Sequence, residues 1–271
     1  MANPNKKIII SIEANEYGGK STVAKALVEK LNSLGLPNVN AKYARFPGTS
    51  PVGEKLRNII KEGNVSSLTD LGLALANHSA GYDYITNSEE YKDASLIVLD
   101  RNLESILVYQ GFLGKLALTE PTILNQTIAT LRDKLLQDYH LIRIFLDCNA
   151  DVLDARRAMA NAYDRDATSA DKYDNVSKER LAEMCEYYKI AFSDRYDALF
   201  GGQKLVLNCN LPGATVDAIV DAIIGALQPK QPAPQVPQTE VINHTEDELP
   251  KPTVRVNEDG TVVTTEATPN E

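Results

Sequence analysis

Short apolar runs alternate with longer stretches of helical apolar spacing through residues 1–228. The runs that we expect to form strands are 8–12, 39–46, 96–100, 141–147 and 204–208. The stretches that we expect to form helices are 21–34, 52–61, 68–85, 105–118, 121–138, 150–160, 177–199 and 215–227. Strands this apolar, separated by helices, are typical of a parallel sheet that is covered on both faces. We therefore predict a single α/β domain, with helices on both faces of a parallel sheet of about five strands.

The pattern changes sharply after residue 228. Residues 229–271 hold seven of the thirteen prolines, and their eight Asp or Glu residues outnumber three Lys or Arg residues. Because large apolar residues are scarce there, we predict a Pro-rich acidic tail that is mostly disordered. One exception is 253–264, where two Thr-Val runs flank Asn-Glu-Asp-Gly and predict a hairpin. We expect it to form only against a partner protein or the body of the molecule.

Composition narrows the classes of function. The chain is 43% hydrophobic and 24% charged, as in soluble globular proteins, and its net charge of -9 argues against broad binding to nucleic acid. No apolar run approaches the roughly 20 residues that span a membrane, and 8–12 is too short for a signal-peptide core. The cysteines show no metal-ligand spacing; they are Cys148, Cys185 and Cys209. We therefore expect a cytoplasmic protein.

The first expected strand leads into the first expected helix through Gly18-Gly19-Lys20-Ser21. A P-loop requires this context, because successive backbone N–H groups and the helix N-terminus then form a concave site for phosphates. Lys20 would supply charge to the phosphates of ATP, and Ser21 would offer its hydroxyl to Mg²⁺. The predicted ATP-phosphate contacts are Tyr17, Gly18, Gly19, Lys20, Ser21 and Thr22. The motif has glycine where Ala14 stands, so the sequence does not settle the geometry of the loop. The alternative interpretation of Gly-Lys-Ser is an ordinary helix start after a strand.

Three further segments follow in order behind this loop. They are Arg45-Phe46-Pro47-Gly48 running into Gly53 to Arg57; Asp100-Arg101, then Ser105 and Tyr109-Gln110-Gly111; and Arg156-Arg157, then Asp164-Arg165-Asp166. With these segments the chain resembles, across about residues 7–228, the thymidylate kinase family of P-loop nucleoside monophosphate kinases. The resemblance implies a P-loop NTPase-type kinase domain over 1–228 with a lid at about 158–175. It also implies transfer of a phosphoryl group from ATP, with Mg²⁺, to a deoxynucleoside monophosphate, taking dTMP to dTDP in nucleotide biosynthesis.

The resemblance also implies roles for individual residues. Lys20, Arg101 and, from the lid, Arg165 would be catalytic, and Asp100 would join Ser21 beside Mg²⁺. Two arginines would grip the phosphate of the acceptor, since an arginine fork binds phosphate bidentately. The implied acceptor-binding set is Glu16, Arg45, Phe46, Arg101, Ser105, Tyr109 and Gln110. Members of this family are usually homodimers, so the resemblance implies a homodimer as well.

Three departures from the family pattern bear on the base of the acceptor. Ala74 stands where an aromatic residue would stack on thymine, His78 where an arginine is expected, and Glu16 replaces the usual loop aspartate. Another (deoxy)nucleotide or a deoxynucleoside is therefore an alternative acceptor, although Arg45 and Arg101 favour one that bears a phosphate. A catalytically weakened nucleotide-binding regulatory protein is the other alternative. The tail is a candidate segment for binding an unknown protein.

Overall fold

The computed structural model of the chain describes residues 6–63, 65–162, 177–210, 214–227, 253–256 and 262–265. The chain divides into two units, Met1–Leu227 and Gln228–Glu271. Among the described residues, every helix is too short or too polar to cross a membrane. All segments that carry candidate chemistry belong to the first unit.

The first unit is built on a parallel sheet with the strand order β2-β3-β1-β4-β5. Its strands are β1 (Lys7–Glu13), β2 (Ala41–Arg45), β3 (Leu96–Asp100), β4 (Tyr139–Asp147) and β5 (Gln203–Asn208). The predicted five-stranded parallel sheet is therefore confirmed. The register places both Ile12 and Arg45 opposite Asp100, so the carboxyl ends of β1, β2 and β3 meet at one edge. Ligands of open α/β sheets bind at this edge.

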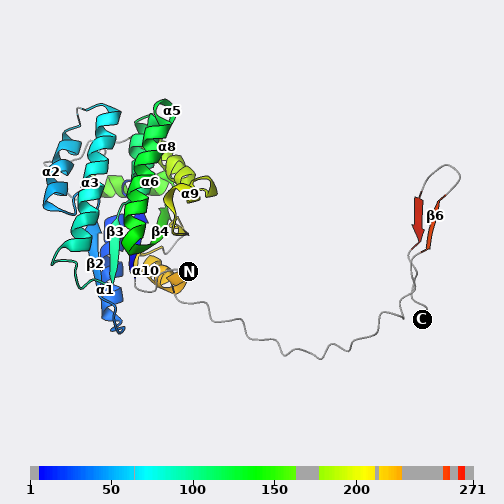
Figure 1. Cartoon of the computed structure of the whole chain (residues 1–271), viewed down its shortest axis with the longest axis horizontal. Helices are drawn as coiled ribbons and strands as arrows, with labels where there is room; N and C mark the ends of the chain where they lie inside the picture. The colour runs from blue at the N-terminus through cyan, green and yellow to red at the C-terminus, as the bar shows by residue number, and fades with distance from the viewer. Residues whose placement is uncertain are drawn as a thin grey trace. The chain divides into compact units, whose positions relative to one another are not determined.

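Helices cover both faces of the sheet (Figure 1). They are α1 (Lys20–Ser33), α2 (Pro51–Glu62), α3 (Ser67–Asn87), α4 (Leu103–Ile106), the π-helix η1 (Leu107–Leu113), α5 (Leu116–Thr119), α6 (Pro121–Asp138), α7 (Ala150–Ala162), α8 (Lys178–Ala191), the 3-10 helix η3 (Asp194–Tyr196), α9 (Asp197–Phe200) and α10 (Val216–Leu227). Alternate strand residues supply two cores, because successive side chains point to opposite faces. Ile9 and Leu99 pack with α3, η1 and α6, whereas Ile10 and Val98 pack with α1 and α10.

The helix expected at 105–118 is broken in the structure. It is divided among α4, η1 and α5, because the chain widens into a π-helix and then turns sharply. The N–H of Gly114 bonds the carbonyl of Tyr109 at 2.9 Å, and Lys115 follows with a φ of 63°. A Cβ at Gly114 would lie 2.5 Å from the carbonyl oxygen of Gln110, so this turn requires glycine. Apolar spacing does not register such a break, and π-helical turns are frequent at functional sites.

The helix expected at 177–199 ends early, as α8. Ser193 leaves helical geometry, with φ -71° and ψ 159°, and its hydroxyl donates to the carbonyl of Ile190 at 2.7 Å. The separate helices η3 and α9 then continue the chain. Of the predicted lid at 158–175, residues 163–175 lie outside the described residues.

The second unit contains an antiparallel pair of strands, β6 (Thr253–Val256) and β7 (Val262–Thr265). Val256 pairs with Val262, and Thr253 pairs with Thr265. The strand pairing predicted over 253–264 is thus present. The predicted disorder of the rest of the tail lies outside the described residues.

Candidate active site

The phosphate loop connects β1 to α1, and Asn15 closes it. The carbonyl of Asn15 accepts from the N–H of Gly18 at 3.1 Å, and its side-chain amide donates to the carbonyl of Leu181 at 2.9 Å. Helix α1 then begins after Gly19, whose φ is 83° and which makes no side-chain cap. The first N–H groups of a helix have no partner within the helix. Those of α1 are therefore directed at the site where an anion would bind.

Ala14 does not distort this loop. It is fully buried and has no positive φ, whereas Tyr17 and Gly19 adopt φ values of 60° and 83°. A Cβ added to Gly18 would lie only 2.6 Å from the Cβ of Ala14. The loop thus requires glycine at position 18, where Ala14 fills the space, and accepts alanine at position 14. The left-handed residue with a side chain is Tyr17, which carries the strain that glycine would avoid.

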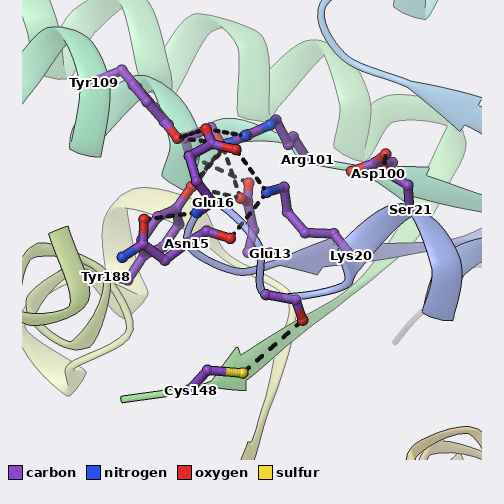
Figure 2. A network of polar contacts seen from close by, with 12 residues as sticks. Glu13, Asn15, Glu16, Lys20, Ser21, Asp100, Arg101, Tyr109, Cys148 and Tyr188 are labelled. Carbon is purple, nitrogen blue, oxygen red and sulfur yellow. Dashed lines mark hydrogen bonds and ion pairs between the residues drawn. The ribbon is translucent and has the colours of Figure 1, made fainter. Parts of the chain in front are cut away.

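Lys20 lies at the start of α1 with its ammonium group pointing back over the loop (Figure 2). Its Nζ donates to the carbonyl of Asn15 at 3.1 Å and lies 3.6 Å from Oε2 of Glu16. Burial lowers the pKa of Lys20 and the charge of Arg101 lowers it further, while Glu16 raises it. The lysine and Arg101 are thus two cations near each other in a poorly solvated site. Such an arrangement favours an anionic ligand.

Arg101 follows β3 directly and has a φ of 73°, which is unusual for a residue with a side chain. Its guanidinium donates to Oε1 of Glu16 at 2.6 Å (Figure 2). It also donates to the hydroxyls of Tyr109 at 3.1 Å and Tyr188 at 3.2 Å. Burial alone would raise the pKa of Glu16, but the charges of Arg101 and Lys20 outweigh burial and lower it to about 2. Glu16 is therefore a carboxylate that joins the phosphate loop to Arg101.

Ser21 and Asp100 meet at the end of β3. In Figure 2 they lie on the side of Lys20 away from Glu16. The hydroxyl of Ser21 donates to Oδ2 of Asp100 at 2.5 Å. Asp100 is 2% exposed, and its Oδ1 accepts no hydrogen bond from any described residue. A buried carboxylate oxygen without a donor is costly unless water or a cation satisfies it.

A pocket adjoins this network and includes three of its members, Glu16, Arg101 and Tyr109. It holds about 610 Å³ of space, part of it open to solvent. Its lining residues are Glu16, Phe46, Pro47, Ile60, Ala74, His78, Arg101, Ser105, Ile106, Tyr109 and Gln110. Six of the seven residues predicted to bind the acceptor are in this lining. The exception is Arg45, whose guanidinium pairs with Glu54 at 2.8 Å. Because Glu16 and Arg101 also belong to the loop network, the pocket and the phosphate loop share a wall.

One part of the pocket lining is buried and uncharged. The ring of Phe46 is fully buried and stacks on His78, with centroids 4.7 Å apart. Gly81 makes this possible, since a Cβ there would lie 2.2 Å from the Phe46 ring. Nδ1 of His78 bonds the carbonyl of Ala74 at 2.9 Å, and burial lowers the pKa of His78 to about 4. His78 is therefore neutral at pH 7, at a position where arginine would be charged.

Gln110 brings an amide to this part of the pocket. Its Nε2 donates to Oδ2 of Asp70 at 3.1 Å. A carboxylate only accepts hydrogen bonds, so Asp70 fixes the orientation of the amide, with the nitrogen toward Asp70. Oε1 of Gln110 receives no hydrogen bond from a described residue, and it is not among the buried polar atoms that lack a partner. Gln110 lines the pocket, so this oxygen is available to accept a hydrogen bond from a ligand.

A family model described as thymidylate kinase matches residues 12–199, well over half of the chain. The chain belongs to the thymidylate kinase family. A thymidylate kinase from Dehalococcoides mccartyi strain CBDB1 is 35% identical over 108 residues, which are 39% of this chain and 50% of that protein. One from Symbiobacterium thermophilum is 26% identical over 121 residues, which are 44% of this chain and 55% of that protein. The chain thus spans about half the length of these curated relatives.

A solved structure is similar to this thymidylate kinase family member over more of its length. The crystal structure of the thymidylate kinase from Ehrlichia chaffeensis matches with a TM-score of 0.52 and 18% identity. The match covers 83% of this chain and 100% of that chain. At this identity the likeness shows the fold.

Sequence reasoning missed the role of Glu13 in this thymidylate kinase fold. Its carboxyl group accepts from the N–H of Asn102 at 2.6 Å, and from the N–H and hydroxyl of Ser105 at 3.2 and 2.7 Å. Burial and the nearby Glu104 raise the pKa of Glu13 to about 8. Glu13 thereby ties the end of β1 to the turn that follows Arg101. An acid that ends an otherwise apolar strand was the available signal.

The roles of two predicted arginines are not tested by the described residues. Arg165 lies outside the described residues, so its catalytic role stays a prediction. Arg45 ends β2 opposite Asp100, but its side chain is 40% exposed and bound to Glu54, so its grip on a phosphate also stays a prediction. Tyr43, Asp70 and Tyr188, by contrast, contact site residues without having been predicted to do so. They stand out only once the fold brings them to Asp100, Gln110 and Arg101.

Proposed function

We propose that this protein transfers the terminal phosphoryl group of ATP to a deoxynucleoside monophosphate, with dTMP as the preferred acceptor. One observation carries the proposal: Arg101 lines the pocket, and its guanidinium lies 2.6 Å from Glu16 of the phosphate loop. A phosphate that Arg101 holds in the pocket would therefore lie beside one held by the loop. Phosphoryl transfer depends on bringing two such groups together in line.

The charges support this chemistry. Phosphoryl transfer requires little covalent help from the protein, but it requires neutralisation of the charge that spreads over the transferred group. Lys20 and the N-terminus of α1 would serve the donor, and Arg101 would serve the acceptor. Glu16 contacts both cations, so it holds their side chains in place. Arg45, and Arg165 from the predicted lid, would add positive charge when nucleotides bind.

Ser21 and Asp100 fit the Mg²⁺ that accompanies ATP. The unpartnered Oδ1 of Asp100 and the lone pairs of the Ser21 hydroxyl are the oxygen groups that Mg²⁺ and its bound waters require. Among the described residues, no cluster of three or more His, Cys, Asp or Glu could hold a metal alone. That arrangement suits Mg²⁺, which is usually held by one or two carboxylates together with substrate phosphates. Bound there, Mg²⁺ would neutralise phosphate charge.

Gln110 supports a pyrimidine with a 4-oxo group as the base. With its nitrogen turned to Asp70, the amide offers the pocket a carbonyl oxygen and its second N–H. Thymine presents an N3–H donor beside the O4 acceptor, which complements this edge. Cytosine presents an acceptor and a donor in the opposite order. To match cytosine the amide would have to flip, which would place its oxygen against the Asp70 carboxylate.

A different acceptor is the second candidate, and the lining of the pocket favours keeping it. Ala74 leaves room where an aromatic residue would stack, and His78 is neutral. Another deoxynucleoside monophosphate could use that room. A nucleotide-binding regulatory protein without turnover is a weaker candidate, because Ala14 leaves the loop backbone undistorted.

A panel of acceptors tests the proposal. ADP formation would be measured with ATP, Mg²⁺ and, in turn, dTMP, dUMP, dCMP, dAMP, dGMP and thymidine. We expect dTMP to give the largest kcat/KM and thymidine to give no turnover. Faster turnover of another monophosphate would favour the second candidate, and no turnover with any acceptor would contradict a kinase.

A variant of Arg101 tests whether the wall shared by the pocket and the phosphate loop contributes to turnover. Arg101→Ala should lower kcat/KM by about 10²- to 10³-fold, because a preorganised contact to the acceptor phosphate is lost. Arg180→Ala is the matched control, since the Arg180 side chain on α8 is 40% exposed and pairs with Glu183. Circular dichroism would establish that both variants fold.

A further inference from the structure

Tyr43 is a second hydroxyl donor to the carboxylate of Asp100. It lies in β2, and its hydroxyl donates to Oδ2 of Asp100 at 3.0 Å. Ser21 donates to the same oxygen at 2.5 Å. Both donors therefore bind one side of the carboxylate, and Oδ1 on the other side accepts from no described residue.

The sheet and its surroundings hold Tyr43 in this position. Its backbone pairs with Val98 of β3, and its carbonyl accepts from the hydroxyl of Tyr91 at 2.8 Å. Nζ of Lys25 lies 5.5 Å from the centroid of its ring.

Without such donors the carboxylate would have competing partners. Lys20 stands beside Ser21 at the start of α1, and Arg101 follows Asp100 directly along the chain. A carboxylate free to rotate could turn toward either cation. The two hydroxyls on Oδ2 oppose that rotation and keep Oδ1 available.

We propose that Tyr43 is a positioning residue for the Mg²⁺ that comes with the nucleotide, acting through the orientation of Asp100. The inference rests on the proposed function, since it assumes that the loop binds a Mg²⁺-nucleotide complex. Groups that hydrogen-bond a metal-binding carboxylate commonly change metal affinity by 10- to 100-fold when removed. The P-loop motif does not specify the residue at position 43, and here the structure places the tyrosine hydroxyl on Asp100.

The test measures how much Mg²⁺ strengthens nucleotide binding. ADP affinity would be determined by titration calorimetry with Mg²⁺ and with a chelator, for the wild type, Tyr43→Phe and Tyr84→Phe. Tyr84 is the matched control, because its hydroxyl donates to the carboxylate of Glu90 at 2.9 Å on the surface. In Tyr43→Phe we expect the gain in affinity from Mg²⁺ to fall about tenfold, with binding in chelator unchanged. Tyr84→Phe should behave as the wild type.

A double variant shows whether the effect passes through Asp100. In an Asp100→Asn background, Tyr43→Phe should have no further effect on the gain from Mg²⁺, because the carboxylate on which it acts is gone. The inference would be overturned if Tyr43→Phe kept the full gain in ADP affinity from Mg²⁺. It would also be overturned if Tyr43→Phe reduced that gain equally in the wild-type and Asp100→Asn backgrounds. If wild-type protein shows no Mg²⁺-dependent binding of ADP, the proposed function fails instead. Comparable circular dichroism spectra would exclude misfolding as the cause of a loss.

Discussion

The two parts of the candidate site are built in opposite ways. Around the phosphate loop, buried charges lie in direct contact, with Glu16 between Lys20 and Arg101. The part of the pocket around Ala74 and His78 is nearly free of charge, and its histidine is neutral. Phosphate recognition needs fixed positive charge, whereas recognition of a base needs shape and a few oriented hydrogen bonds.

This difference explains why the sequence predicts the type of reaction more readily than it predicts the base of the acceptor. The phosphate region depends on backbone N–H groups and on charged residues that stand close to the loop in sequence or at a strand end. The base region depends on packing, as where Gly81 admits the ring of Phe46 against His78. Variants in the two regions should therefore fail in different ways.

The largest effect is expected in the phosphate region. Lys20→Ala should lower kcat about 10³-fold, because the charge over the transferring phosphate is lost. Steady-state ADP formation would measure it. Lys30→Ala is the control on the same helix, since Lys30 is half exposed and pairs with Asp221 at 3.5 Å. Comparable activity in the two variants would show that Lys20 of the phosphate loop takes no part in catalysis.

A smaller and more selective effect is expected in the base region. In Asp70→Asn the Gln110 amide can flip, since asparagine both donates and accepts. The ratio of kcat/KM for dTMP to that for dCMP should fall about tenfold. Asp83→Asn makes the same change at an exposed site on α3, where Asp83 pairs with Lys134, and should leave the ratio unchanged. An equal loss with both substrates would mean that Asp70 only supports the fold.

The smallest effect concerns Glu13, which ties the end of β1 to the turn that follows Arg101. Folding raises the pKa of Glu13 from 4.5 to about 8, so the folded state holds this proton in a pH range where the unfolded state has lost it. Its contribution to stability is therefore complete below pH 4.5 and is lost as the pH rises to about 8. Glu13→Gln cannot ionise, so its melting temperature should fall less than that of the wild type across this range, by a few degrees.

Thermal unfolding followed by circular dichroism from about pH 5 to pH 8 would measure this difference. Glu29→Gln, at an exposed glutamate of α1, is the control and should follow the wild type. Parallel pH profiles for Glu13→Gln and the wild type would show that Glu13 is ionised in the folded protein.

Most of the fold and much of the site were predictable from local pattern. Apolar strands between helices predicted the parallel sheet, and Gly18 to Ser21 marked the loop, because both signals lie within a few consecutive residues. The break at Gly114 was not predictable from spacing, since it depends on backbone contacts within a π-helix. The concern over Ala14 was likewise settled by geometry, because the left-handed turn falls on Tyr17.

Local pattern was enough to predict the order of elements, the phosphate loop and the charged residues at strand ends, because hydrophobic periodicity and short motifs depend on neighbouring residues alone. The fold decided which of those charges meet, since Glu16 and Arg101 are 85 positions apart and touch because of the strand order. It also decided that Asp70 orients Gln110 and that Tyr43 reaches Asp100. Such contacts depend on which side chains a fold brings within about 3 Å of each other, and spacing along the chain does not encode that distance.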